Sequence, residues 1–174
     1  MKGSFLTSSA KIQQLDKKGI YRLCANELYK DEDGIIYLAW RNFQTDNFTW
    51  INSSDWDTRC SHIHDIGCKY HQIVRVNLNE TELKEKGILQ ISPCSCNELI
   101  CNDIPKEYLE VVKVSGHKIN NMFYRMLKAA DCPKTPKFIQ ILYRCGVALN
   151  FKWFTSGKKK INLEKIYDRK WNEN

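Results

Sequence analysis

The stretch IYRLCANELYKDEDGIIYLAWRNF, residues 20–43, decides the fold because it predicts an antiparallel hairpin. Two runs rich in β-branched and aromatic residues, 20–29 and 35–43, flank the polar turn KDEDG. Gly34 closes this turn, and glycine adopts a positive φ at little cost. We therefore expect a small antiparallel sheet near the N-terminus.

Helical periodicity predicts the elements that cover this sheet. Residues 62–72 are expected to form a helix that Asp57 or Ser61 can open as an N-cap, although Gly67 inside it costs up to about 1 kcal/mol relative to alanine. A second helix, about 117–130, repeats apolar residues every three and four positions. A last helix follows DCPKTP and carries an apolar stripe of Phe138, Leu142, Cys145 and Leu149.

The expected fold class is therefore α+β, with a small N-terminal antiparallel sheet packed against three or more helices. We expect a single domain over residues 20–154, after a flexible N-terminus (1–19) and before a basic C-terminal tail (155–174). Residues 72–116 are interpreted as a cysteine-rich insertion. It begins with a short strand and a brief helix opened by Asn79 or Thr81, and it is irregular from about residue 92 onward.

Composition indicates an ordered protein of the cytoplasm. Hydrophobic residues make up 43% and charged residues 27% of the 174 residues, which is enough for a core and argues against wholesale disorder. No apolar run approaches the ~20 residues that span a bilayer, and no apolar segment near the N-terminus resembles a signal peptide. The eight cysteines are then expected to be reduced, as buried thiols or metal ligands.

The net charge of +7 is concentrated partly at the C-terminal end. Residues 152–174 contain seven Lys/Arg and three Asp/Glu. Such a segment contacts phosphate or an acidic partner, although a solvated chain end is the more common role. No recognised nucleic-acid-binding motif accompanies the charge.

The stretch SHIHDIGCKYH, residues 61–71, contains the main candidate site. His64, Cys68 and His71 are spaced i, i+4, i+7, so on a continuous helix they share one face and can present imidazole and thiolate to one zinc ion. Asp65 lies off that face, where it can act as a general base or hold an imidazole tautomer. The alternative is that these are ordinary core or surface residues of a helix.

Three clustered cysteines form a second candidate metal site. Cys94, Cys96 and Cys101 can bind zinc together with His71 or Cys68, which would hold the insertion against the helix, or they are buried thiols under a loop. Asp46 is a candidate catalytic carboxylate facing His64, or equally a turn residue whose side chain bonds backbone amides.

Four segments in the same order resemble a family of small phage and prophage proteins, the domain of unknown function one-three-five-three. They are NFQTD (42–46), IHDIGCKY (63–70), INNMFYRMLKAADCP (119–133) and ILYRCGVALNFKWF (141–154). The resemblance implies a phage or prophage origin, an α+β fold and a role for the His64–Asp65 pair, but no reaction. Asn42 stands where the family usually has Gly, and Asn120 where it has Asp, so Asn120 is no base.

Three functions follow from these observations. The first is a metal-dependent hydrolase in which zinc lowers the pKa of bound water to about 7, Asp65 or Asp46 takes the proton, and Asn120 or His117 approaches from the later helix. The second is a non-catalytic phage-encoded binding or inhibitor protein that acts on a host defence protein or on a nucleic-acid complex. The third is a zinc-stabilised structural module.

Overall fold

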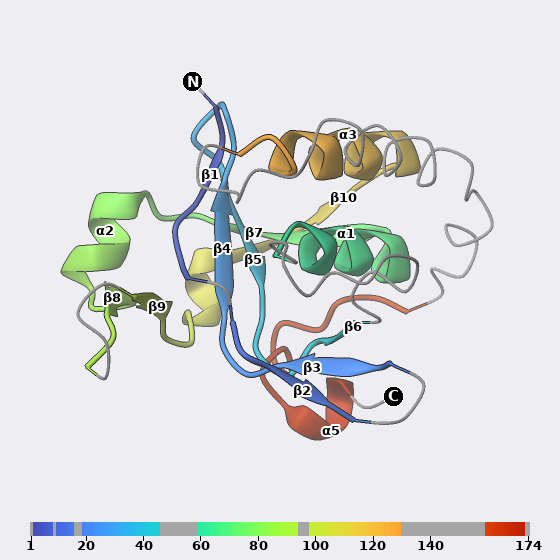
Figure 1. The fold of residues 1–174 in the computed structure, drawn as a ribbon, viewed down its shortest axis with the longest axis horizontal. Helices are drawn as coiled ribbons and strands as arrows, with labels where there is room; N and C mark the ends of the chain where they lie inside the picture. The colour runs from blue at the N-terminus through green and yellow to red at the C-terminus, as the bar shows by residue number, and fades with distance from the viewer. Residues whose placement is uncertain are drawn as a thin grey trace.

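The computed structural model describes residues 2–8, 10–15, 19–45, 59–93, 98–129 and 159–172. In this part of the chain the protein is α+β, with three antiparallel sheets (Figure 1). The central sheet has the strand order β1 (Ser4–Phe5), β4 (Glu27–Lys30), β5 (Ile36–Ala39), β7 (Gln72–Val76), β10 (Leu109–Lys113). The smaller sheets are β2 (Ile12–Gln14), β3 (Tyr21–Leu23), β6 (Gln44–Thr45) and β8 (Leu89–Ile91), β9 (Leu99–Cys101).

The predicted hairpin is present as β4 and β5. Lys30 lies opposite Ile36, the Asp31 carboxylate accepts hydrogen bonds from two turn amides at 2.9 Å, and Gly34 has φ +84°. The hairpin is shorter than expected, however, because residues 21–23 leave it and form β3 in a different sheet. The buried side chain of Asn26 fixes this corner, where its Oδ1 accepts the Arg41 amide at 2.7 Å.

The described residues of the segment expected to be a flexible N-terminus pair with two of the sheets. β1 pairs with the outer edge of β4, and β2 pairs with β3. Phe5 and Leu6 are buried, and the Thr7 hydroxyl accepts the Leu28 amide at 3.1 Å. The edge of the hairpin offers unpaired backbone groups, and this segment satisfies them.

The segment expected to be an insertion supplies part of the central sheet. β7 lies between β5 and β10, so it is an interior strand. The portion expected to be irregular contains β9, the 3-10 helix η1 (Lys106–Tyr108) and β10. The brief helix α2 (Glu80–Glu85) begins after Asn79, which forms a reciprocal capping box with Glu82, as one of the two predicted caps.

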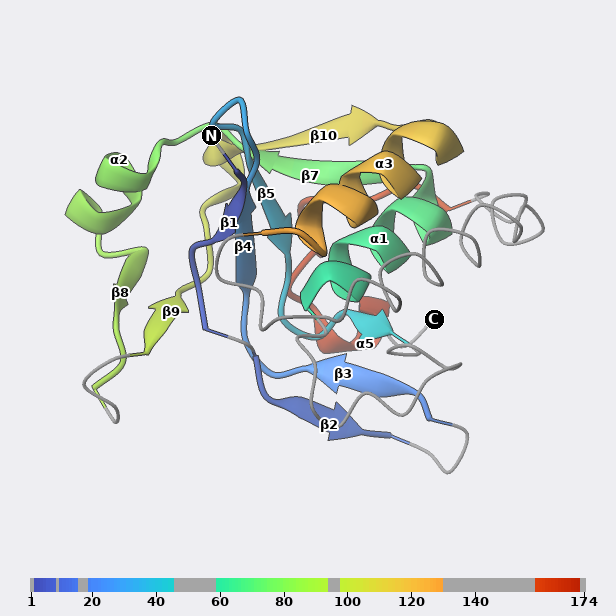
Figure 2. The same cartoon turned by 45° about the horizontal axis from the view of Figure 1, so that its top comes forward.

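The two long described helices lie side by side on one side of the central sheet, and α2 with β8 and β9 lies on the other (Figures 1 and 2). They are α1 (Arg59–Tyr70) and α3 (Gly116–Met126). The predicted apolar face of α3 is buried at Ile119, Met122, Phe123 and Met126. Ser61 lies inside α1 and is not its cap. Asp57, the expected last helix and its apolar stripe lie outside the described residues.

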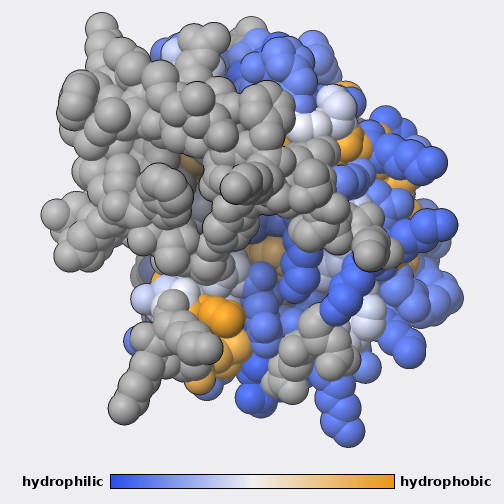
Figure 3. Space-filling view, turned by 90° about the vertical axis from the view of Figure 1, so that its right-hand side faces the viewer, coloured by the Kyte–Doolittle hydropathy of each residue, from blue (hydrophilic) through white to orange (hydrophobic). Residues whose placement is uncertain are grey.

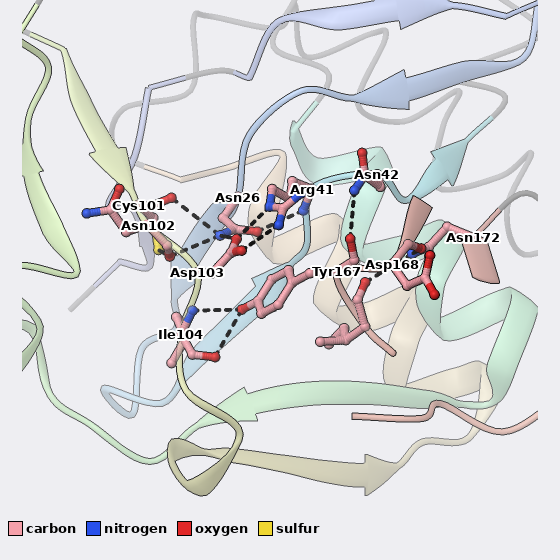
Figure 4. A network of polar contacts seen from close by, with 11 residues as sticks. Asn26, Arg41, Asn42, Cys101, Asn102, Asp103, Ile104, Tyr167, Asp168 and Asn172 are labelled. Carbon is pink, nitrogen blue, oxygen red and sulfur yellow. Dashed lines mark hydrogen bonds and ion pairs between the residues drawn. The ribbon is translucent and has the colours of Figure 1, made fainter. Parts of the chain in front are cut away.

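The C-terminal segment is not a solvated end where it is described. Ile161 and Ile166 are buried, and the short helix α5 (Arg169–Asn172) places Asn172 against the core, where its Oδ1 accepts the indole N–H of Trp40 at 2.8 Å. Figure 4 shows Tyr167 of the same segment bonded to Ile104, beside the Arg41–Asp103 ion pair. No helix in the described ranges has the length and apolar character needed to cross a membrane.

Candidate functional site

His64 lies on the side of α1 that faces α3. Its Nε2 is 3.1 Å from Oδ1 of Asn120, and its Nδ1 is 3.6 Å from Oδ1 of Asp65. The expectation that Asn120 approaches from the later helix is therefore confirmed. His117, the alternative, is exposed and bonds to Asn121 one turn later at 2.9 Å.

Asp65 links the helix pair to the small sheet. Its Oδ2 accepts a hydrogen bond from the hydroxyl of Thr45, which ends β6. Asp46 follows Thr45 directly but lies outside the described residues, so its two predicted roles stay open. The NFQTD segment (42–46) therefore contacts α1 through the hydrogen bond from Thr45 to Asp65.

The imidazole of His64 is enclosed by an aromatic ring and a sulfur atom. Its ring centroid is 4.7 Å from that of Phe123, and its side chain is 14% exposed. Sγ of Cys68 lies 3.5 Å from Nε2 and 3.9 Å from Nδ1. A sulfur nearly equidistant from both nitrogens packs against the ring and does not lie on the line of one N–H.

These neighbours favour the imidazolium form of His64. Burial alone lowers the pKa of His64, but the adjacent Asp65 carboxylate and Cys68 sulfur outweigh it and raise the pKa to about 10. A protonated ring donates from both nitrogens, and Asn120 and Asp65 each present an oxygen to one of them. His64 thereby donates from Nε2 to Asn120 on α3, and its Nδ1 faces the Asp65 carboxylate at 3.6 Å.

The charge of His64 predicts a pH-dependent contribution to stability. A free histidine titrates near pH 6.5 and His64 near 10, so its stabilising contribution is complete below about pH 6.5 and is lost as the pH rises to about 10. The difference in unfolding free energy between the wild type and His64→Gln should shrink over this range, as measured by urea titrations at pH 6, 8 and 9.5. A difference that stays constant with pH would contradict a protonated His64.

Of the other predicted zinc ligands, Cys68 lies against His64, whereas His71 and Cys101 do not join them. His71 follows α1 with φ +53°, a left-handed conformation that ends the helix and breaks the i, i+7 register. Cys101 lies in β9, across the central sheet from α1 (Figure 1), and its thiol donates to the Asn102 carbonyl at 3.1 Å. Burial, followed by the charge of Asp103, raises the pKa of Cys101 to about 12, which disfavours the thiolate that binds metals.

Cys94 and Cys96 lie outside the described residues. Among the residues that are described, no three His, Cys, Asp or Glu side chains are arranged to hold a metal ion. The zinc sites expected from spacing therefore stay predictions.

A buried contact between His62 and Glu27 was not predicted from the sequence. Nδ1 of His62 lies 2.6 Å from Oε2 of Glu27, and both side chains have 0% exposure. Oε1 of the same glutamate accepts the Ala10 amide at 2.8 Å, so the pair joins α1, β4 and the N-terminal segment. The available signal was a glutamate inside a run predicted to be a strand, since a buried carboxylate needs a polar partner.

No protein-family model, curated protein or solved structure matches this chain, so the resemblance to the phage family stays a prediction.

Proposed function

We propose that this protein is a non-catalytic binding protein for an anionic partner, and that the His64–Asp65 cluster serves as a structural link. The observation that carries the proposal is that an acceptor oxygen faces each ring nitrogen of His64. A general base or a zinc ligand needs a free imidazole lone pair.

The link stabilises the relative positions of three elements. His64 and Asp65 belong to α1, Asn120 belongs to α3, and Thr45 ends β6. The amide oxygen of Asn120 suits this role because it accepts an N–H without adding a second charge beside Asp65. These contacts support a structural role, in which the cluster holds α1, α3 and β6 in fixed relative positions.

The charge of the chain supports an anionic partner. Its net charge of +7 attracts acidic surfaces and nucleic-acid phosphates over a distance of about 8–10 Å at physiological salt. With the phage-type resemblance, the proposed partner is a host protein or nucleic-acid complex, which the protein occludes by binding.

Histidine NMR tests the proposal, with the His64→Gln spectrum used to assign the resonances of this ring. We expect His64 to stay protonated on both nitrogens at pH 7.5, to titrate near pH 10, and to keep its shifts when equimolar zinc is added. A ring that titrates near pH 6.5 and shifts with zinc would overturn the proposal in favour of a metal-dependent hydrolase.

A further inference from the structure

Lysines from four segments gather at the end of the molecule where α1 finishes and β7 begins. We call this surface the basic end, and its residues are Lys69, Lys113, Lys118, Lys159 and Lys160. Figures 1 and 2 show the end of α1, the end of β10 and the beginning of α3 on this same side.

Backbone and side-chain contacts hold the segments together. Lys113 lies opposite Gln72 in the β7–β10 register. The Oε1 atom of Gln72 accepts the Ile161 amide at 2.9 Å, which fixes the residues just after Lys159 and Lys160 beside the same strand. One residue beyond Lys113, the Val114 amide donates to the His71 carbonyl at 3.0 Å, so the first turn of α3 with Lys118 begins there.

The segments that form the basic end carry positive charge only. Residues 66–79, 111–129 and 155–163 contain no aspartate and no glutamate. Lys113, Lys118, Lys159 and Lys160 are exposed, and Lys69 is half-buried, with its ammonium 5.6 Å from the ring centroids of Phe43 and Tyr70.

Lys69 and Lys159 lie close enough to influence each other. Burial, and then the positive charge of Lys159, lower the pKa of Lys69, while the charge of Asp65 opposes them. Asp65 already accepts the Thr45 hydroxyl and faces His64, so its negative charge is not devoted to Lys69 alone. A bound anion would offset the repulsion among these ammonium groups.

From this juxtaposition we infer that the basic end binds the phosphate backbone of double-stranded nucleic acid, independently of its sequence. The inference rests on the proposed binding function and names its surface and partner. Lysine acts as a flexible point charge and contacts phosphates, whereas bidentate reading of bases is typical of arginine and asparagine.

The composition of the basic end favours nucleic acid over an acidic protein. Protein interfaces have an apolar core, whereas nucleic-acid interfaces are polar and strongly positive. The exposed large hydrophobic residues of the described ranges are Ile20 and Ile91, and neither belongs to these segments. On the side of the molecule that Figure 3 faces, hydrophilic residues make up most of the described surface.

The aromatic residues of the same segments favour a duplex over a single strand. Proteins that bind single strands stack bases on exposed aromatic rings. In the described parts of these segments Tyr70 and Phe123 are buried, and Tyr124 is half-buried with the ammonium of Lys128 3.9 Å from its ring centroid.

Fluorescence anisotropy with a labelled 20-base-pair duplex, measured from 50 to 200 mM salt, tests the inference. The change is Lys159→Ala with Lys160→Ala. The matched control is Lys84→Ala in α2 with Lys86→Ala directly after it, which removes the same net charge. For two lost phosphate contacts, the slope of log K against log salt should become shallower by about 1.8, equally for duplexes of unrelated sequence. The control should keep the slope of the wild type.

Two outcomes would overturn the inference. An equal loss in both double variants would show that net charge alone attracts the duplex. Absence of duplex binding at 50 mM salt, together with lysine-dependent binding of polyglutamate, would assign the basic end to an acidic protein and leave the proposed binding function standing. The histidine titration reports on the proposed function separately, because it involves neither lysine.

Discussion

A His62→Leu variant is expected to lose about 3–5 kcal/mol of its free energy of unfolding, because it strands the buried carboxylate of Glu27. In the wild type the two side chains are fully enclosed and 2.6 Å apart. Leucine fills most of the volume of histidine but offers no hydrogen bond. Among the described residues, the Ala10 amide is then the remaining hydrogen-bond donor to Glu27. Urea unfolding at pH 7 measures the loss.

A double variant separates stranded charge from lost packing. Glu27→Gln in the His62→Leu background removes the charge and keeps an oxygen for the Ala10 amide, so the double variant should be more stable than His62→Leu alone. The matched control is His117→Leu at an exposed position of α3, which should stay within about 0.5 kcal/mol of the wild type. A double variant no more stable than the single one would show that packing, not charge, dominates.

Gly67→Ala is expected to destabilise the protein by about 1–3 kcal/mol, although alanine is the better helix former by about 1 kcal/mol. A Cβ at this position of α1 would lie 2.3 Å from Cγ1 and 2.5 Å from Cδ1 of Ile119, which is fully buried. The methyl group would therefore push α1 and α3 apart at the level of the His64 link. Urea unfolding measures the effect.

Removal of the opposing Ile119 side chain should reverse the effect of Gly67→Ala on the free energy of unfolding. Ile119→Ala alone costs about 2–5 kcal/mol because it leaves a cavity. In that background the methyl group added by Gly67→Ala loses the two closest contacts, those with Cγ1 and Cδ1, and keeps the β-carbon of residue 119, at 3.2 Å in the wild type. Gly67→Ala should then be neutral or stabilising. If Gly67→Ala costs the same in both backgrounds, the helices do not meet at this glycine.

Local patterns gave the elements that were predicted correctly. The β4–β5 turn rests on Asp31 and Gly34, α2 on its capping box at Asn79, and the buried face of α3 on three-and-four periodicity. Each of these signals lies within a few residues of the element that it specifies, so composition and spacing are enough to detect it.

The same local reasoning failed where distant segments complete a sheet or a core. Residues 1–19 and 72–116 are not locally distinctive, yet they supply β1, β2, β7 and β10. Strand pairing depends on which edges are left open after the hairpin forms, and this is a property of the folded sheet. The tail was misread for a similar reason, since Asn172 bonds to Trp40 across 132 residues.

The sequence by itself determined the hairpin, the two long described helices and the presence of His64 and Asp65 on one of them. Only the tertiary structure decided what these residues do. It placed Asn120, 56 residues away, at Nε2 of His64, and it placed Glu27, 35 residues away, at His62. It also brought the lysines of the basic end together. Protonation and charge density depend on neighbours in space, which periodicity and spacing along the chain do not encode.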